Sequence, residues 1–153
     1  MDIRVAMENH HGNVRRALEY ACVTKGVVDG AKQPGFSAAS WDPLRALVSV
    51  HDFVRVGNFK ETMRWDEYVS FLTGWASAAE WDCSFKRITE AGGLVFLELE
   101  ERSAFGEFSN SVNSLSVYEF TQEGAIRRID VYLQMALPPS ALPDAYEGVA
   151  ISE

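Results

Sequence analysis

Apolar and polar side chains alternate along residues 93–105, whose sequence is GLVFLELEERSAF. Successive side chains of a β-strand point to opposite faces, so Val95, Leu97 and Leu99 would share one face. Glu101 is the next residue on that face. The pattern therefore predicts a strand whose buried side ends in a carboxylate.

Three further segments in the second half of the chain also have the composition of strands. Short turns such as TQEG separate them, and turns of this length join antiparallel neighbours. In the last segment Ile129 and Val131 are apolar between polar residues, so the odd-numbered side should face the core. The four predicted strands are residues 82–90, 94–105, 110–120 and 125–134.

Two segments have the apolar spacing of amphipathic helices, residues 13–28 and residues 64–81. In the second, apolar residues fall at the i, i+3, i+4 and i+7 positions that one helix face requires. A shorter helix is expected at SWDPLRALV, where Pro43 falls in the first turn. The last eighteen residues, 136–153, have no such periodicity and predict an irregular C-terminal tail.

The segment SVHDFVRVGNF, residues 49–59, is rich in β-branched and aromatic residues and predicts a first strand. The sequence alone does not fix the register of this strand. In one register Arg55 faces the core, and in the other Val54 and Val56 do.

Helices followed by an antiparallel meander are typical of an α+β fold with helices on one face of a curved sheet. The chain has 153 residues, of which 47% are hydrophobic. That length and composition predict a single domain over residues 1–153, with its core at about residues 13–135.

The charge balance argues against a nucleic-acid partner. Fourteen Lys and Arg stand against 22 Asp and Glu, giving a formal net charge of -8 without a basic cluster. Apolar runs all fall short of the ~18 residues that a membrane span needs, so we expect no membrane contact and a cytoplasmic location.

Motifs for metals and cofactors are also missing from the sequence. The two cysteines have no Cys-x-x-Cys or Cys/His spacing, so we expect no metal site. Phosphate-binding loops, dinucleotide fingerprints and nucleophile elbows do not occur, so we expect no cofactor.

Three segments in order, HDFVRVGNF, WDEYVSFLTGWA and NSLSVYEFTQEGAIRRIDVYL, resemble the nuclear transport factor 2-like superfamily and, within it, SnoaL-like proteins. The resemblance implies a cone-shaped α+β barrel, in which a strongly bent, mainly antiparallel sheet wraps around about three N-terminal helices. It also implies an apolar pocket at the wide end. The superfamily includes isomerases, cyclases, dehydratases, hydrolases and non-catalytic domains, so the fold does not fix the reaction.

Catalytic sets of this superfamily match the sequence only in part. The Arg and Asp of limonene epoxide hydrolase-like enzymes correspond to Leu99 and Glu101, and their second Asp corresponds to Val131. The protonated acid of ketosteroid isomerases corresponds to Ser116, and Tyr20 lies near the position of their tyrosine. Neither set is present as a whole.

Glu101 is the candidate catalytic residue, because a carboxyl on an apolar wall could serve as acid or base near neutral pH. The alternative is an open rim, where Glu101 would be hydrated or paired with Arg55 or Arg102. The expected pocket lining is Tyr20, Arg55, Trp75, Leu97, Leu99, Ser114, Ser116, Tyr118, Ile129 and Val131.

The sequence thus favours a protein that binds a small apolar or amphipathic molecule. It would act as a cofactor-independent isomerase, cyclase, dehydratase or hydrolase with Glu101 as acid/base. The alternative is a non-catalytic ligand-binding or dimerisation module. Apolar residues on the convex face of the sheet, such as Phe96 and Tyr132, predict a homodimer through that face.

Overall fold

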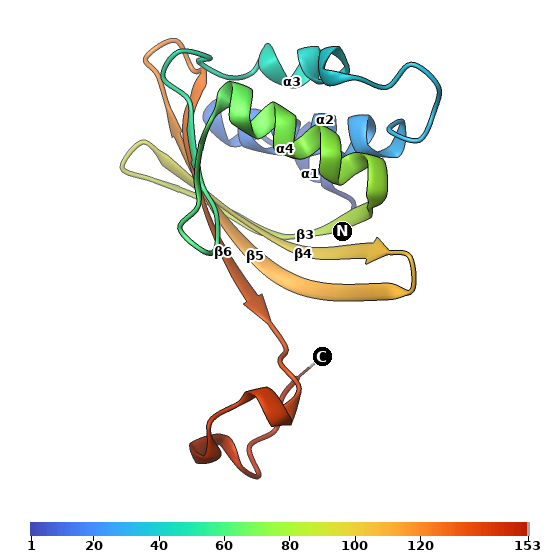
Figure 1. Cartoon of the computed structure of the whole chain (residues 1–153). Coiled ribbons are helices and arrows are strands. Elements are labelled where there is room, and N and C mark those ends of the chain that lie inside the picture. Colours follow the sequence, from blue (N-terminus) through green and yellow to red (C-terminus); the bar gives the residue numbers. More distant parts are fainter. Residues whose placement is uncertain (153) are drawn as a thin grey trace.

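The computed structural model describes residues 1–152 and shows helices packed against one face of a bent sheet (Figure 1). The six strands have the order β2-β1-β6-β5-β4-β3, so the sheet is open, with β2 and β3 at its edges. Only β1 and β6 pair in parallel. The predicted α+β class and mainly antiparallel sheet are confirmed. The strands are β1 (Val54–Val56), β2 (Thr62–Arg64), β3 (Glu80–Ala91), β4 (Leu94–Phe105), β5 (Phe108–Phe120) and β6 (Ile126–Met135).

Both predicted amphipathic helices are present, as α2 (Gly12–Asp29) and α4 (Trp65–Ala78). A short 3-10 turn, η1 (Ala38–Trp41), leads into the expected short helix, α3 (Asp42–Arg45). Helix α4 ends earlier than predicted. Ala79 has extended backbone angles, and the chain enters β3 immediately afterwards.

The N-terminal residues form a helix that the sequence analysis did not predict, α1 (Ile3–Glu8). Ile3 and Ala6 are buried in the core, and the Met1 carbonyl accepts a hydrogen bond of 2.9 Å from the Phe85 backbone. The expected core boundary near residue 13 is therefore too late, because α1 packs on the same core as α2.

The predicted first strand is shorter than expected, and β2 was not predicted. Strand β1 lies parallel to β6, with Arg55 opposite Ile129. Paired residues share a face, so Arg55 lies on the inner face of the sheet. This pairing decides the register that the sequence left open.

Strand β4 has the predicted alternation. Val95 and Leu97 are fully buried and Leu99 is 5% exposed, whereas the residues between them are partly exposed. The preceding turn has Gly92 and Gly93 at φ of 59° and 77°. Only glycine enters this left-handed region without strain, so the two glycines fix the start of β4.

Aromatic side chains pack α4 against the edge of the sheet. The Phe53 ring contacts Trp65 edge-on with centroids 5.2 Å apart, and it stacks on Tyr68 at 5.9 Å. Phe53 is fully buried, and Trp65 and Tyr68 are nearly so. This cluster fixes the first half of α4 over the inner face of the sheet.

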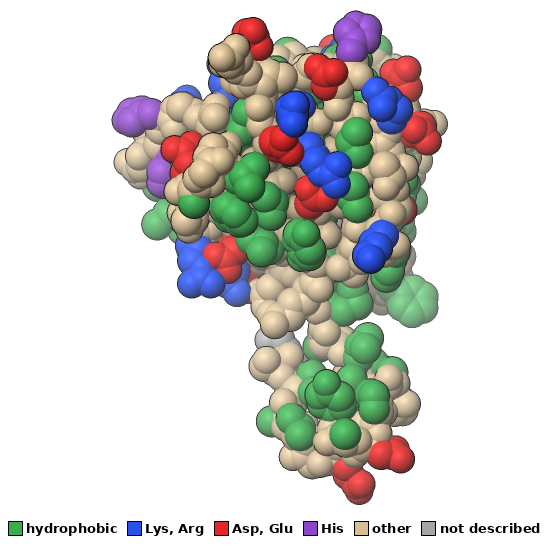
Figure 2. Space-filling view, turned by 90° about the vertical axis from the view of Figure 1, so that its left-hand side faces the viewer, with side chains coloured by type: hydrophobic (Ala, Val, Ile, Leu, Met, Phe, Trp, Pro, Cys, Tyr) green, Lys and Arg blue, Asp and Glu red, His purple; other side chains and the backbone are tan. Residues whose placement is uncertain are grey.

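The C-terminal tail, residues 136–152, projects away from the sheet after β6 (Figure 1). It contains two short 3-10 turns, η2 (Pro139–Ala141) and η3 (Asp144–Tyr146), and is otherwise irregular as predicted. Figure 2 shows hydrophobic side chains gathered on this projecting segment, where Tyr146 and Val149 are more than half exposed. Glu153 lies outside the described residues.

Replacing Leu97 with alanine should lower the free energy of unfolding by about 2–5 kcal/mol, because the deletion leaves a cavity in the core. The matched control is Leu137→Ala in the tail, where the leucine is 43% exposed and the loss should stay below about 0.5 kcal/mol. Urea unfolding followed by circular dichroism measures both. Equal losses for the two variants would contradict the burial of Leu97.

Candidate functional site

A cavity of about 290 Å³ lies between the inner face of the sheet and helices α2 and α4. Most of its lining side chains are aromatic or aliphatic. The structure brings the predicted catalytic residue Glu101 to this cavity. Of the residues predicted to line the pocket, it brings together Tyr20, Arg55, Trp75, Leu99, Ser116, Tyr118, Ile129 and Val131.

Two residues of the predicted lining do not reach this cavity, Leu97 and Ser114. Leu97 is fully buried in the core under the helices. Ser114 is 3% exposed and lies between Leu99 and Leu133, its partners on the adjacent strands. Those two larger side chains line the cavity instead.

Glu101 lies beside Trp81, whose Nε1 donates a hydrogen bond of 2.9 Å to Glu101 Oε2. Strand β3 places Cys83 directly opposite Glu101 and Trp81 two residues before it, so all three share the inner face. Within residues 1–152, Glu101 makes no ion pair, and its Oε1 accepts no hydrogen bond. One carboxylate oxygen thus accepts a hydrogen bond, and the other has no partner among the described residues.

Neither arginine that the sequence suggested as a partner reaches Glu101. Arg102 lies on the opposite face of β4, where it binds Asp82 at 3.1 Å and Glu100 at 2.7 Å. Arg55 instead lies 3.9 Å from Glu61.

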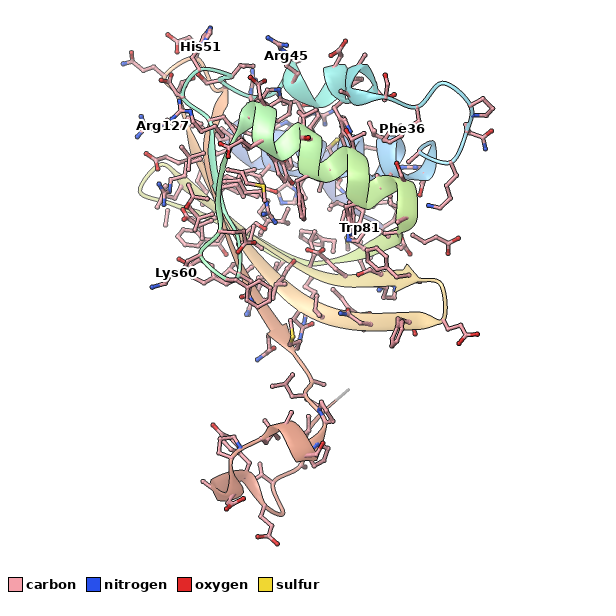
Figure 3. The ribbon with its side chains drawn as sticks, viewed as in Figure 1. Phe36, Arg45, His51, Lys60, Trp81 and Arg127 are labelled. Carbon is pink, nitrogen blue, oxygen red and sulfur yellow. The ribbon has the colours of Figure 1, made fainter. Side chains whose placement is uncertain are left out.

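Two indole rings form a corner of the cavity, Trp75 from α4 and Trp81 from β3. Their centroids are 6.3 Å apart and their planes meet at 67°. Figure 3 labels Trp81 in the space between the end of α4 and the sheet. Sequence reasoning missed Trp81 because it was assigned to the end of the helix. Trp81 and Cys83 are two residues apart, which is the spacing of residues on one face of a strand. That spacing is the sequence signal for Trp81.

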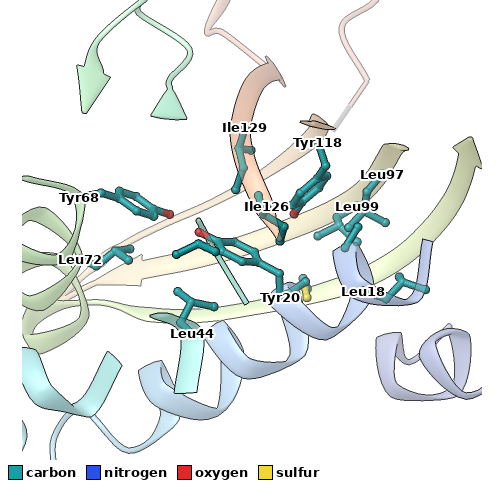
Figure 4. Packing of buried hydrophobic residues seen from close by; sticks show 14 of the residues in the cluster. Leu18, Tyr20, Leu44, Tyr68, Leu72, Leu97, Leu99, Tyr118, Ile126 and Ile129 are labelled. Atoms are coloured by element: carbon teal, nitrogen blue, oxygen red, sulfur yellow. The ribbon is translucent and has the colours of Figure 1, made fainter. Parts of the chain in front are cut away.

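Three tyrosines line the cavity, Tyr20 from α2, Tyr68 from α4 and Tyr118 from β5. The Tyr20 and Tyr118 rings meet edge-on at 5.8 Å. The Tyr20 hydroxyl is buried, with no hydrogen-bond partner among the described residues. Figure 4 shows it pointing toward the hydroxyl of Tyr68. A ligand oxygen in the cavity would therefore compete with Tyr68 for the Tyr20 hydroxyl proton.

The environment keeps the phenols of Tyr20 and Tyr118 protonated. Burial raises the pKa of Tyr20 well above its ordinary value, and the neighbouring Tyr68 adds to the shift. Burial, followed by Tyr68 and Glu101, also raises the pKa of Tyr118. Tyr20 and Tyr118 are therefore neutral hydrogen-bond donors at physiological pH.

Arg55 is held at the cavity wall by two contacts. Its guanidinium lies 4.9 Å from the centroid of the Tyr68 ring, and Nη1 is 3.9 Å from Glu61 Oε1. Glu61 lies directly over Gly57, where an added Cβ would come within 1.6 Å of its Oε1. A larger residue at position 57 would therefore displace the Glu61 carboxylate, a shift that this flexible side chain can make. Three further residues line the cavity and were not predicted from the sequence, Phe59, Glu61 and Tyr68. Their place in the cavity depends on how loops and helices pack in the folded chain.

Groups of three or more His, Cys, Asp or Glu side chains that could hold a metal ion do not occur within residues 1–152. In the same part of the chain, every helix is too short or too polar to cross a bilayer.

Solved structures share this architecture. The BvnE pinacolase from Penicillium brevicompactum has a TM-score of 0.64 and 8% identity, with 80% of this chain and 85% of that chain covered. SalBIII, an epoxide hydrolase/cyclase-like enzyme, has a TM-score of 0.59 and 15% identity, with 79% of this chain and 92% of that chain covered. An LEH-like epoxide hydrolase from M. tuberculosis has a TM-score of 0.56 and 15% identity, with 76% of this chain and 83% of that chain covered.

Other matches are described as NTF2-like or SnoaL-like proteins. This chain has the NTF2-like fold. Identities this low establish the fold alone, and neither a family model nor a curated protein matches the sequence. In the NTF2-like fold of this chain, the cavity lies between the helices and the concave side of the sheet.

Cys83, opposite Glu101, should make the stability of the protein fall at alkaline pH. Burial, together with the nearby Glu101 charge, raises the pKa of Cys83 to about 12. In the unfolded state the thiol has a pKa of about 8.5. Above that pH the unfolded state therefore loses a proton that the folded state keeps. The contribution of Cys83 is complete below about pH 8.5 and is lost toward pH 12.

The free energy of unfolding should therefore fall by about 1 kcal/mol more in the native protein than in Cys83→Ala between about pH 8.5 and 9.5. Urea titrations of both proteins at each pH measure the difference. Identical pH dependence in the two proteins would show that the Cys83 thiol is not shielded as described.

Proposed function

We propose that this protein binds a compact, mostly apolar small molecule in the cavity and acts on it by proton transfer without a cofactor. The observation that carries the proposal is the Glu101 carboxylate, which lines the cavity and accepts a hydrogen bond from Trp81 through one of its oxygens. A positioned carboxylate with a free oxygen can take up a proton and return it.

The tyrosines supply the second half of such a reaction. Proton removal next to a carbonyl, or opening of a ring at an oxygen, places negative charge on a ligand oxygen. Neutral hydroxyl donors in a cavity shielded from water stabilise that charge. Tyr20 is placed for this role by its buried hydroxyl, which lacks a partner among the described residues, with Tyr118 next to it.

Proteins of the same fold support this reaction class. Those compared above are described as a pinacolase, an LEH-like epoxide hydrolase and an epoxide hydrolase/cyclase-like enzyme with a role in pyran ring formation. We propose that this chain likewise acts as an isomerase, cyclase, dehydratase or hydrolase. A non-catalytic binding module is the second candidate, because Leu99 and Val131 stand where epoxide hydrolase-like enzymes have polar catalytic residues.

A test uses two compact probes, 3-cyclohexen-1-one for isomerisation and styrene oxide for ring opening. We expect turnover of at least one probe above the buffer rate. Turnover should fall at least about 100-fold in Glu101→Gln, because the amide cannot accept the proton. Ultraviolet absorbance follows the conjugated ketone, and chromatography follows the diol.

The matched control is Glu100→Gln, on the same strand but on the opposite face, paired with Arg102. It should retain turnover within about twofold, because Glu100 does not line the cavity. Full activity in Glu101→Gln would exclude the acid/base role. Tryptophan fluorescence that saturates with 3-cyclohexen-1-one, without turnover of either probe, would favour the binding module.

The convex face of the sheet supports the proposal of a homodimer. Tyr132 on β6 is 57% exposed there, and Phe96, Leu115 and Val117 of β4 and β5 are partly exposed on the same side. Nothing in residues 1–152 covers Tyr132 fully. A second copy would remove this apolar surface from water.

Sedimentation at micromolar concentration should give a particle of twice the chain mass of 17.1 kDa. Tyr132→Glu should shift it to a single chain, because the charge would be buried between the copies. Ser70→Glu, at an exposed site on helix α4 on the other side of the sheet, is the control. A native protein that sediments as one chain would refute the dimer.

We also propose a cytoplasmic location. Cys22 and Cys83 are free thiols, and free thiols are typical of proteins in reducing compartments.

A further inference from the structure

The charges of the cavity wall do not balance. Its charged lining residues are Arg55, Glu61 and Glu101, which sum to one positive and two negative charges. Arg55 and Glu61 are 3.9 Å apart and largely neutralise each other. Glu101, which is partly exposed, has no ion-pair partner within residues 1–152. A partner of opposite sign stabilises a partly buried carboxylate.

Nearby cations of the chain are already engaged elsewhere. Arg102 points to the outer face and binds Asp82 and Glu100. Lys25, at the end of α2, binds Asp29 at 2.6 Å and lies 3.8 Å from Asp82. Within residues 1–152, no side chain supplies the missing positive charge to Glu101.

Two indole rings lie near the same carboxylate. Trp81 donates a hydrogen bond to Glu101 through its Nε1, and the Trp75 ring meets the Trp81 ring at 67°. Aromatic rings beside a carboxylate form the kind of site that attracts ammonium groups, because the ring faces carry partial negative charge.

We infer that the ligand of this cavity carries a compact alkylammonium group, which lies between Glu101 and the indole rings of Trp75 and Trp81. The positive charge offsets the unmatched carboxylate, while methyl or methylene groups on the nitrogen contact the rings. This inference rests on the proposed function, since it assigns a ligand class to the same cavity. An oxygen on the same ligand would find donors in the Tyr20 and Tyr118 hydroxyls.

The test compares two probes of nearly equal shape. Choline has a trimethylammonium group and a hydroxyl, and 3,3-dimethylbutan-1-ol has the same outline with carbon in place of the charged nitrogen. Each is titrated into the full chain at constant ionic strength, and binding is followed by tryptophan fluorescence and calorimetry. Sodium chloride in place of choline chloride controls for salt.

Choline should bind at least about tenfold more tightly than the neutral alcohol, from the ion pair and the cation–π contacts together. Glu101→Gln should abolish this preference, whereas Glu100→Gln should retain it. Trp75→Leu should weaken choline binding more than alcohol binding, because a leucine keeps an apolar wall but lacks the ring.

Three results would overturn the inference. If the alcohol binds as tightly as choline, the cavity selects shape alone, and the proposed function stands if 3-cyclohexen-1-one still binds. If the preference for choline persists in Glu101→Gln, the cation lies elsewhere. If neither choline nor 3,3-dimethylbutan-1-ol shows saturable binding while 3-cyclohexen-1-one does, only the ligand class is wrong. If all three compounds fail to bind, the proposed function fails as well.

Discussion

Burial of one face of β4 is the constraint on which the site depends. Val95, Leu97 and Leu99 are held under the helices, so the strand cannot slip by one residue without exposing them. Such a slip would also exchange the two faces beyond Leu99, turning Glu101 outward. The apolar core therefore fixes the direction of the Glu101 carboxylate.

The same arrangement gives the cavity its chemical asymmetry. Helices α2 and α4 contribute Tyr20 and Tyr68, β5 contributes Tyr118, and β3 and β4 contribute Trp81 and Glu101. Because the Tyr20 and Tyr68 hydroxyls lie on helices that pack against the sheet, their positions depend on the core as much as that of Glu101 does. Hydrogen-bond donors and a carboxylate are thus held around one space.

The NTF2-like fold explains why the site cannot be deduced from architecture. Proteins of this fold include a pinacolase and epoxide hydrolase-like enzymes at 8–15% identity to this chain. What they share is a bent sheet that leaves a space under the helices, whereas the chemistry depends on which few side chains enter it. In this chain the entering groups are one unpaired carboxylate, tyrosine hydroxyls and a pair of indoles.

The sequence by itself determined the local elements and their faces. Periodicity identified α2, α4 and the strands β3 to β6, and alternation placed Glu101 inward, because helix and strand periods depend only on neighbouring residues. Helix α1 and strand β2 escaped this reasoning, since each is too short to show a period.

Tertiary structure alone decided which inward residues reach the cavity. Arg55 faces it because β1 pairs in parallel with β6, more than 70 residues later in the chain. Leu97 and Ser114 do not line it, although they lie on the predicted face, because packing covers them. Trp81 and Glu61 enter the site through contacts between distant segments. Local periodicity specifies the direction of a side chain, whereas the packing of remote elements decides what space lies in front of it.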